Sequence, residues 1–432
     1  MIWQTVHELI AGTVLLAVLA LIIIRPRGLD LAWPAGIGAL LVILLGLLSL
    51  NSLITIFGDT WDATVTLISL FLLSQTLDSN GFFNWSALSL ARLARGSGWR
   101  LYGLMLLLTL AVVALLANDG AVLMLTPIFA RLLQKIYPRQ SLRLPFLFAT
   151  GLFADAMSTI FIPSNLTNII IADANQLSFL RFAAWMLLPT LAAFVVGGSA
   201  FALRFHKHIG ASYQADLLET PTSAIVDRLL FRIGWGALGV LAVGYVVGSE
   251  FHLPFSLISG TVAVSMLLLV RLRGLQSTRV ILSKAPWSIL LYALSMFVVI
   301  TAAYRASILG FIIDPLTATT HAGLPGALAA GSIVAFLSAL VNNLPATLVS
   351  VLALRAATHV SHVTIYALVL GVNIGPKLTP FGSLATLLWL GILKDHDTPI
   401  SWGTYIRENW WVVLLTFSAA FAGLTLSYLL LS

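Results

Sequence analysis

Three ionisable residues, Asp119, Asp155 and Lys377, lie among mainly apolar neighbours in the sequence. A charged side chain at the centre of a bilayer costs about 2.5–3.5 kcal/mol on insertion scales, so such a residue is a candidate for function. Carboxyl and ammonium groups can bind and release protons. We predict that Asp119 or Asp155 approaches Lys377 and that this charged centre carries a transported proton.

Two structural roles compete with this prediction. Asn118 or Asp119 can cap a helix that begins near Ala121, and an Asp–Lys pair can hold two helices in register without moving a proton. Substitutions that neutralise these charges and leave coupled transport intact would exclude the coupling role.

Hydroxyl and amide side chains gather around the same positions. Such a lining suits a small hydroxylated solute, and the N-termini of broken helices add partly positive backbone donors. Each residue alone can instead join membrane helices, a contact worth about 0.6 kcal/mol. The predicted binding set is Asn118, Gly120, Ser164, Asn165, Thr167, Asn168, Asn342, Asn343, Asn373, Thr379, Ser383 and Thr386.

The composition predicts the kind of fold that must position these residues. The chain has 432 residues, of which 59% are hydrophobic and 9% charged, and its mean hydropathy is +1.00. Long unbroken apolar runs indicate an all-α polytopic membrane protein rather than a β-barrel. There is no cysteine, which excludes disulfides, thiolate metal sites and a cysteine nucleophile. We find no nucleotide-binding or hydrolase motif, and we predict no enzyme activity, cofactor or metal.

We predict ten membrane spans, two re-entrant hairpins and two broken helices. The segments 101–136 and 326–357 have polar tips and are the predicted hairpins; a kinked full span is the alternative in each place. Proline and glycine interrupt the spans 144–176 and 363–393, and such breaks are tolerated only where protein or a water-lined cavity surrounds them. The spans are expected at about 7–24, 31–50, 61–78, 144–176, 183–205, 229–248, 254–270, 286–304, 363–393 and 410–431.

The positive charges test this layout. Of the 23 Lys and Arg residues, only Arg181, Arg305 and Arg355 fall on the predicted outer side, and Lys377 falls within the membrane. Such a bias supports ten spans with both termini on the outer side of the membrane. It also explains the net charge of +7 by topology rather than by nucleic-acid binding.

The two halves of the sequence resemble each other. The segment 117–123 aligns with 342–348, and the segment 151–168 aligns with 371–387 when one gap is allowed. Five spans and a hairpin per half give an odd number of crossings, so the second copy is inverted, a common plan in transporters. We therefore predict a first inverted repeat at 1–205, a cytoplasmic linker at 206–228 and a second repeat at 229–432.

Several motifs resemble the bacterial arsenite/antimonite efflux permeases of the ArsB family. The resemblance covers nearly the whole chain, and the longest motif, from Gly375 to Trp389, is the most specific. The other motifs are Leu116-Ala117-Asn118-Asp119-Gly120-Ala121, Pro163-Ser164-Asn165-Leu166-Thr167-Asn168, Asn342-Asn343-Leu344-Pro345, Ser79-Asn80-Gly81-Phe82-Phe83 and Ile400-Ser401-Trp402-Gly403.

This resemblance implies a secondary transporter that extrudes arsenite and antimonite across the inner membrane in exchange for protons, by alternating access between a scaffold region and a moving transport region. It also implies a partner for some members, a soluble ATPase subunit, which we expect on the inner loops at 92–95, 131–143 and 206–227. Some relatives carry an acid where this chain has Asn373, so Asp119 and Asp155 must carry more of the coupling here.

The solute's chemistry agrees with these residues. Arsenite near neutral pH is mostly As(OH)₃, and a chain without cysteine must recognise it by hydrogen bonds and shape. Exchange for one proton moves one net charge, worth about 2.3 kcal/mol at 100 mV, enough for a gradient of roughly 50-fold.

Other carriers of the same superfamily are the main alternative. Sodium-coupled carboxylate carriers use two Ser-Asn-Thr turns, but Leu166 follows Ser164-Asn165 here, and the second copy reads Ser383-Leu384-Ala385. A sodium/proton antiporter and a passive channel are further alternatives, and transport against a gradient separates a pump from a channel.

Overall fold

The structure is a computed structural model that describes residues 2–431, and it is all-helical. Among these residues there is no β-strand, only one isolated bridge between Ser97 and Ser212. The α-helices are α1 (Ile2–Ile24), α2 (Ala32–Leu44), α3 (Leu50–Ser79), α4 (Phe82–Leu93), α5 (Gly98–Leu116), α6 (Asn118–Ile136), α7 (Gln140–Ala156), α8 (Leu166–Ala174), α9 (Phe179–Arg204), α10 (His206–Ile209), α11 (Arg228–Glu250), α12 (Phe255–Leu272), α13 (Thr278–Ser283), α14 (Trp287–Arg305), α15 (Gly310–Thr319), α16 (Gly323–Val341), α17 (Asn343–Ala356), α18 (His362–Ile374), α19 (Leu384–Asp395) and α20 (Trp402–Leu431).

Nine helices within residues 2–431 are long and apolar enough to cross a membrane: α1, α3, α5, α9, α11, α12, α14, α16 and α20. The helices α2 and α17 are shorter, and α7–α8 and α18–α19 are interrupted pairs. A polytopic membrane protein is therefore confirmed. The number of crossings stays a prediction.

Some helix boundaries differ from the predicted spans. The helix α3 begins at Leu50 rather than near 61, and α20 begins at Trp402 rather than near 410. Both extra segments contain charged residues with partners elsewhere in the fold. Asp59 on α3 pairs with Arg355, and Glu408 on α20 pairs with Arg204. The predicted spans therefore begin too late, because hydropathy does not register partners that pair with these charges.

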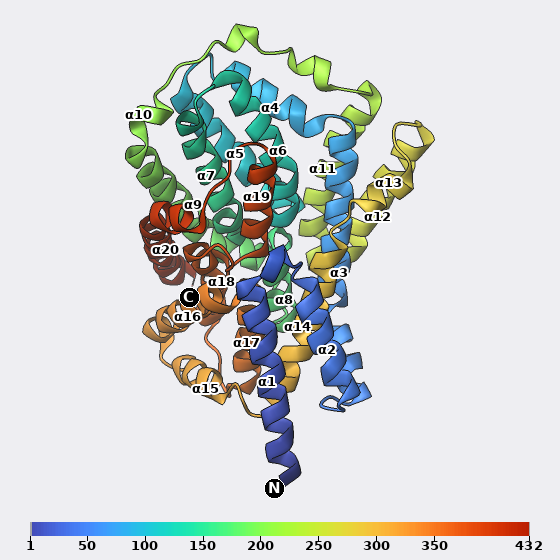
Figure 1. Ribbon diagram of the computed structural model, residues 1–432, viewed down its shortest axis with the longest axis vertical. Coiled ribbons are helices and arrows are strands. Elements are labelled where there is room, and N and C mark those ends of the chain that lie inside the picture. The colour runs from blue at the N-terminus through green and yellow to red at the C-terminus, as the bar shows by residue number, and fades with distance from the viewer. Residues whose placement is uncertain (1, 432) are drawn as a thin grey trace.

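Two regions of helices lie side by side (Figure 1). In the first, α12 packs along α3 and α14 packs along α2. In the second, α9 packs along α20, while α6 packs on α19 and α17 packs on α8. Each of these pairs joins one helix from the first half of the chain to one from the second. If α2 in the first half corresponds to α12 in the second, and α3 to α14, then the α3–α12 pair and the α2–α14 pair are equivalent to each other. This packing supports the two inverted repeats, which we retain as a proposal.

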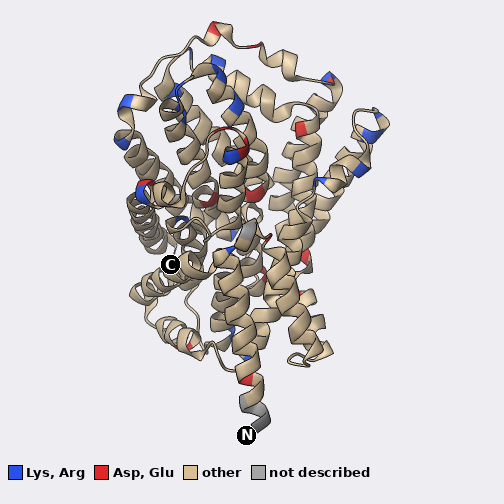
Figure 2. Cartoon of the chain, viewed as in Figure 1, with Lys and Arg blue, Asp and Glu red and all other residues tan. Residues whose placement is uncertain are grey.

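The residues 206–227 cross one end of the molecule, which we call the linker end (top of Figure 1). Many Lys and Arg residues lie at this end (Figure 2). The linker is fastened to it, since the Tyr213 hydroxyl donates to Ala91 O at 2.5 Å. Asn80 bonds both backbone groups of Asp227, at 3.0 and 2.7 Å. Gly81 has φ +79°, and a Cβ there would lie 1.8 Å from Ala224 O, so only glycine allows this approach.

The two interrupted helices form the centre of the core. Every residue of α7 from Pro145 to Ala156 is buried, and so is every residue of α18 from Val363 to Ile374. Broken backbone at membrane depth requires such a protein surrounding, because no water is present to satisfy the freed groups. The fold therefore places both breaks where they can only face protein or an internal cavity.

Candidate functional site

Each break is short and is followed by a capped helix. After α7 the chain forms two 3₁₀ turns, Met157–Ile160 and Ile162–Ser164, and then Asn165 Oδ1 caps α8 by accepting from Thr167 N at 3.2 Å. After α18 it forms the turn Gly375–Leu378, and Ser383 Oγ caps α19 by accepting from Thr386 N at 3.4 Å. The two breaks thus bring two helix N-termini, with their partly positive backbone N–H groups, into the interior.

Asp155 and Lys377 form a buried ion pair between the two breaks. Lys377 Nζ lies 2.8 Å from Asp155 Oδ2, and each side chain is 1% exposed. Asn118 Nδ2 donates to Asp155 Oδ1 at 2.6 Å, and Ser383 Oγ donates to Oδ2 at 2.5 Å. Lys377 Nζ also donates to Thr386 Oγ1 at 2.7 Å and to the Gly151 carbonyl at 3.2 Å. Both charges are therefore paired and hydrogen-bonded, as burial demands.

Asn373 is the centre of a second polar cluster beside this pair. Its Oδ1 accepts from Asn165 Nδ2 at 2.6 Å, from Ser158 Oγ at 3.2 Å and from Thr167 Oγ1 at 3.3 Å. Its Nδ2 donates to Asn168 Oδ1 and to the Val369 carbonyl, both at 2.8 Å. An amide can supply both the acceptor and the donors here, whereas an ionised carboxylate would supply only acceptors.

A small cavity of about 30 Å³ lies where the tips of the two predicted hairpins meet. Asn118 and Asp119 line it from the first tip, and Asn342 and Asn343 from the second. Asn118 Oδ1 is buried without a hydrogen-bond partner, and no described residue donates a hydrogen bond to the Asp119 carboxyl. The other lining residues are Asn165, Leu166, Thr167, Ile289, Tyr292, Ala293, Leu344 and Leu384.

Tyr292 of α14 was not among the predicted site residues. Its hydroxyl donates to Asn342 Oδ1 at 3.1 Å, and the side chain is 2% exposed. The only signal in the sequence was a tyrosine in the middle of a predicted apolar span. That signal does not separate a cavity residue from a packed one.

The remaining predicted residues hold the tips against the breaks. Ser164 Oγ donates to Ala114 O on α5 at 3.2 Å, and Thr379 Oγ1 donates to Ala339 O on α16 at 2.6 Å. Asn342 Nδ2 donates to Phe381 O at 2.9 Å, and Asn343 N donates to Gly382 O at 2.8 Å. Gly120 faces Ser74 Oγ, 3.3 Å from where a Cβ would lie. Ser164, Thr379 and Gly120 therefore hold the site in place without lining the small cavity. Asn342 and Asn343 make such contacts and also line the cavity.

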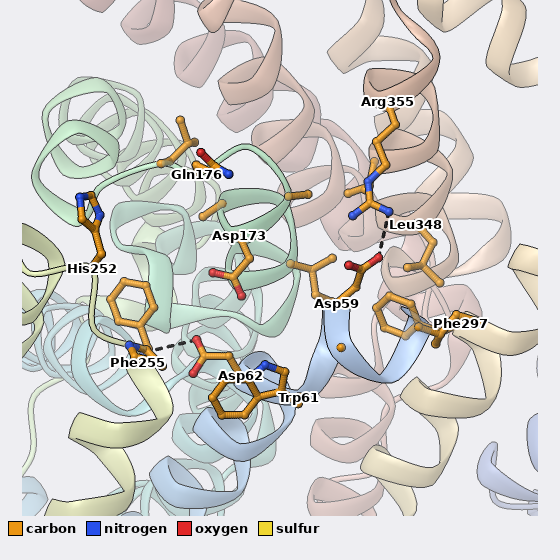
Figure 3. A pocket seen from close by; sticks show the side chains of 18 of the residues that line it. Asp59, Trp61, Asp62, Asp173, Gln176, His252, Phe255, Phe297, Leu348 and Arg355 are labelled. Atoms are coloured by element: carbon orange, nitrogen blue, oxygen red, sulfur yellow. Dashed lines mark hydrogen bonds and ion pairs between the residues drawn. The ribbon is translucent and has the colours of Figure 1, made fainter. Parts of the chain in front are cut away.

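A larger cavity of about 720 Å³, which we call the vestibule, is lined in part by Asp59 and Asp62, near the end of α3 opposite to the one that Asn80 ties to the linker (Figure 3). Three helices, α8, α14 and α17, line both the vestibule and the small cavity. On α17, for example, Leu344 faces the small cavity and Leu348 faces the vestibule one turn further along. The two cavities therefore lie one after the other along the same three helices.

Charged residues line the vestibule from several helices. Arg355 Nη1 of α17 lies 2.9 Å from Asp59 Oδ2 of α3. The Asp62 carboxylate accepts from Phe255 N at 3.2 Å and from Ser256 N at 2.9 Å, at the start of α12 (Figure 3). Asp173 of α8 also faces the vestibule. No group of three or more His, Cys, Asp or Glu residues that could hold a metal is found within the described part of the chain.

Comparisons with known proteins identify the family. The profile of the ArsB family, described as arsenical pump membrane protein, matches residues 10–430. An arsenical pump membrane protein of Yersinia enterocolitica is 36% identical over 428 residues, which is 98% of this chain and 99% of that protein. One of Escherichia coli is 35% identical with the same coverage.

A solved structure supports the fold. The Alcanivorax borkumensis YdaH transporter, whose crystal structure is described as having an unusual topology, superimposes with a TM-score of 0.52 at 14% identity and 87% coverage of both chains. A likeness at this identity concerns the fold alone, and it agrees with the all-helical arrangement seen here. From the family match and the full-length relatives, we conclude that this chain belongs to the arsenical pump membrane protein family of membrane transporters.

Proposed function

We propose that the protein exports arsenite and antimonite across the inner membrane in exchange for protons, by alternating access. The observation that carries this proposal is the Asp155–Lys377 pair, which joins the two breaks and shares Asn118 with the small cavity. A proton that binds at this pair changes the contacts of a residue that lines the cavity. Proton binding and solute binding are then linked through one side chain.

The lining of the small cavity suits As(OH)₃. Amide oxygens and the Asp119 carboxyl can accept from its three hydroxyls, and amide N–H groups can donate to them. No thiol is present in the sequence. The cavity, about 30 Å³, holds about one water molecule. Arsenite is larger than water, so binding requires the two hairpin tips to separate, which is the motion that alternating access needs.

Protonation of Asp155 would remove one member of a buried pair. Breaking such a pair by loss of one partner costs about 3–5 kcal/mol, because the remaining charge is left unpaired. The carboxylic acid formed would no longer hold Lys377, and its contacts with Asn118 and Ser383 would rearrange. Asp119, which accepts no hydrogen bond from described residues, is the group that can pass a proton from the cavity toward the pair.

The vestibule supports an outward route for the solute and an inward route for the proton. It lies toward the end opposite the basic linker end, which the positive-inside rule assigns to the cytoplasm. This orientation gives both termini a periplasmic location. We also propose the linker end, including residues 92–95, 131–143 and 206–227, as the docking face for a soluble ATPase subunit in hosts that supply one.

Inverted membrane vesicles test the proposal. With a proton gradient imposed and no ATP added, arsenite should accumulate inside, and an uncoupler should abolish the accumulation. Arsenite that only equilibrates would indicate a channel or a pump that requires an ATPase. Absence of arsenite movement would contradict the substrate, and sodium-driven carboxylate uptake would then be measured in the same vesicles.

A further inference from the structure

A group of buried polar atoms without partners lies on the linker-end side of Lys377. The hydroxyl of Tyr405, the indole Nε1 of Trp389 and both amide atoms of Asn409 make no hydrogen bond in the structure. The three side chains are 1–2% exposed. Buried polar groups are nearly always satisfied, and several unpartnered ones together usually mark ordered water.

These atoms form one cluster. The Tyr405 hydroxyl lies close to the side chains of Thr386 and Asn409 and interacts with both, but it has a hydrogen bond of good geometry to neither. The rings of Trp389 and Tyr405 lie edge to face, with centroids 6.2 Å apart. Trp389 Nε1 lies beside Gly151, 2.6 Å from where a Cβ there would be, and the Gly151 carbonyl accepts from Lys377 Nζ.

The chemistry of the cluster matches water. Trp389 offers one donor, the Asn409 amide offers two donors and an acceptor, and the Tyr405 hydroxyl can do either. A water molecule needs two to four such partners to be held in an interior. An anion would find no positive charge among these three side chains, and a cation would find no carboxylate.

The cluster lies between two charged groups, Lys377 on one side and the Glu408–Arg204 pair on the other. Lys377 Nζ donates to Thr386 Oγ1 at 2.7 Å, which leaves the hydrogen of the Thr386 hydroxyl free to donate toward the cluster. On the other side, Asn409 follows Glu408 in α20, and Glu408 pairs with Arg204 at 3.6 Å, at the linker-end surface. The unpartnered atoms therefore lie between the buried ammonium and the linker end.

We propose that Trp389, Tyr405 and Asn409 hold ordered water that carries protons between Lys377 and the linker end. This inference rests on the proposed proton-coupled export. When Asp155 no longer balances it, buried Lys377 gives one proton to Thr386 Oγ1, and Thr386 passes its own hydroxyl proton to the first water. Lys377 becomes a neutral amine, Thr386 is unchanged, and the proton leaves as hydronium at the linker end. The two cavities and this path would then give the proton an entrance and an exit on opposite sides of the ion pair.

Water itself can be detected without any transport assay. Radiolytic hydroxyl labelling marks side chains that touch bound water, even when they are buried. Tyr405 and Trp389 of the purified wild-type protein should be labelled, and Asn409→Leu, which fills the space with an apolar side chain, should lower the labelling. Unlabelled Tyr405 and Trp389 in the wild type would overturn the inference.

Transport then tests the path. Arsenite exchange at equal pH is compared with gradient-driven accumulation in inverted vesicles for Asn409→Leu and Tyr405→Phe. Accumulation should fall roughly 100-fold, the low end of what a positioned proton-transfer group contributes, while exchange stays within about twofold of wild type. The matched control is Ser427→Ala, which removes a buried hydroxyl of α20 that already has a partner, Trp185 O at 2.9 Å; it should keep both activities.

The outcomes separate the two proposals. If the wild type accumulates arsenite and Asn409→Leu does so equally well, the water path is wrong and the exporter stands. If Asn409→Leu loses exchange as well, Asn409 serves the fold or the site, and the path is again wrong. A wild type that accumulates no arsenite contradicts the proposed function, and the labelling result still decides whether water is present.

Discussion

Lys377 and Asp155 lie 2.8 Å apart although they belong to different halves of the chain. Asp155 lies in the last turn of α7, just before one break, and Lys377 lies within the other. Each charge has a further hydrogen-bond partner: Thr386 for the ammonium and Asn118 for the carboxylate. The pair is thus the point at which the two breaks, the first hairpin tip and α19 depend on one another.

Neutralising one member of the pair should destabilise the protein, and neutralising both should not. Asp155→Asn or Lys377→Met leaves an unpaired buried charge and should cost about 3–5 kcal/mol of unfolding free energy, most of which the double variant should regain. Tryptophan fluorescence during thermal unfolding measures this. All three variants should lose uncoupler-sensitive arsenite accumulation. Coupled accumulation by the double variant would refute the role of the pair in proton coupling.

Stability and arsenite transport should depend on an amide side chain at position 373. Asn373→Leu removes the acceptor for three donors and should cost about 1–3 kcal/mol of stability for each buried group left unsatisfied. Asn373→Asp keeps the acceptor oxygens but loses the donors to Asn168 and Val369, so we expect an intermediate loss. Unfolding temperature and arsenite exchange are measured together. Equal stability of the leucine variant and the wild type would contradict this account.

Tyr292→Phe should weaken solute binding with little effect on folding. It removes one hydroxyl that donates to Asn342 at 3.1 Å, and a hydrogen bond of this kind is worth about 0.5–1.5 kcal/mol. The KM for arsenite should therefore rise roughly 2- to 13-fold. The control is Tyr304→Phe, on the same helix but outside the cavity lining. An unchanged KM in Tyr292→Phe would remove Tyr292 from the site.

Fixing α17 to α3 across the vestibule should stop transport. Asp59 and Arg355 face each other there at 2.9 Å. Because the sequence contains no cysteine, Asp59→Cys with Arg355→Cys introduces the only two thiols. A bifunctional thiol reagent with a cleavable disulfide should block arsenite transport, and a reductant should restore it. Each single-cysteine variant is the control. Full transport after cross-linking would mean that α17 and α3 do not separate during the cycle.

The same ion pair should contribute little by itself. Both side chains are well exposed, at 48% and 41%, and exposed pairs contribute about 0–1 kcal/mol. Arg355→Gln alone should therefore leave arsenite accumulation within roughly fivefold of wild type. A complete loss of transport in this variant would show that Arg355 acts on the solute or the proton rather than on Asp59.

Asp227 should give the linker an acid-sensitive anchor. Its pKa is lowered, chiefly by the Leu230 N–H, with help from the Leu229 N–H and from Arg273. A lowered folded pKa means that the stabilisation is present above the unfolded value, about 3.9, and is lost as the pH falls through the folded value. Asp227→Asn should lower the unfolding temperature at pH 7 and reduce the further loss below about pH 4. Identical pH profiles for both proteins would contradict this.

The sequence was most informative where it broke its own pattern. Proline and glycine within apolar runs located the breaks near Pro163 and Pro376, and polar residues at the tips located Asn118 and Asn342. The isolated charges of Asp155 and Lys377 were conspicuous for the same reason. Their transport roles remain predictions. Their positions were recognisable because a charged side chain within the membrane is costly and is therefore rare unless it has a function or a partner.

Other features depend on tertiary partners and could not be predicted. Tyr292 reads as an ordinary core residue until Asn342 is placed beside it. The N-terminal turns of α3 and α20 were left out of the predicted spans because they contain the charged residues Asp59 and Glu408. The sequence does not reveal that these residues pair with Arg355 and Arg204. The short helix α15 also went unpredicted; it precedes the second hairpin as α4 precedes the first.

The division of the ion pair between the two halves has a consequence for biosynthesis. Asp155 is made and inserted long before Lys377 exists. At a synthesis rate of roughly 5–20 residues per second, the roughly 220 residues between them take on the order of 10–40 s. During that interval the nascent first half must keep Asp155 protonated, hydrated or sheltered by the insertion machinery. The final fold of the first half therefore waits for the ribosome to finish the second.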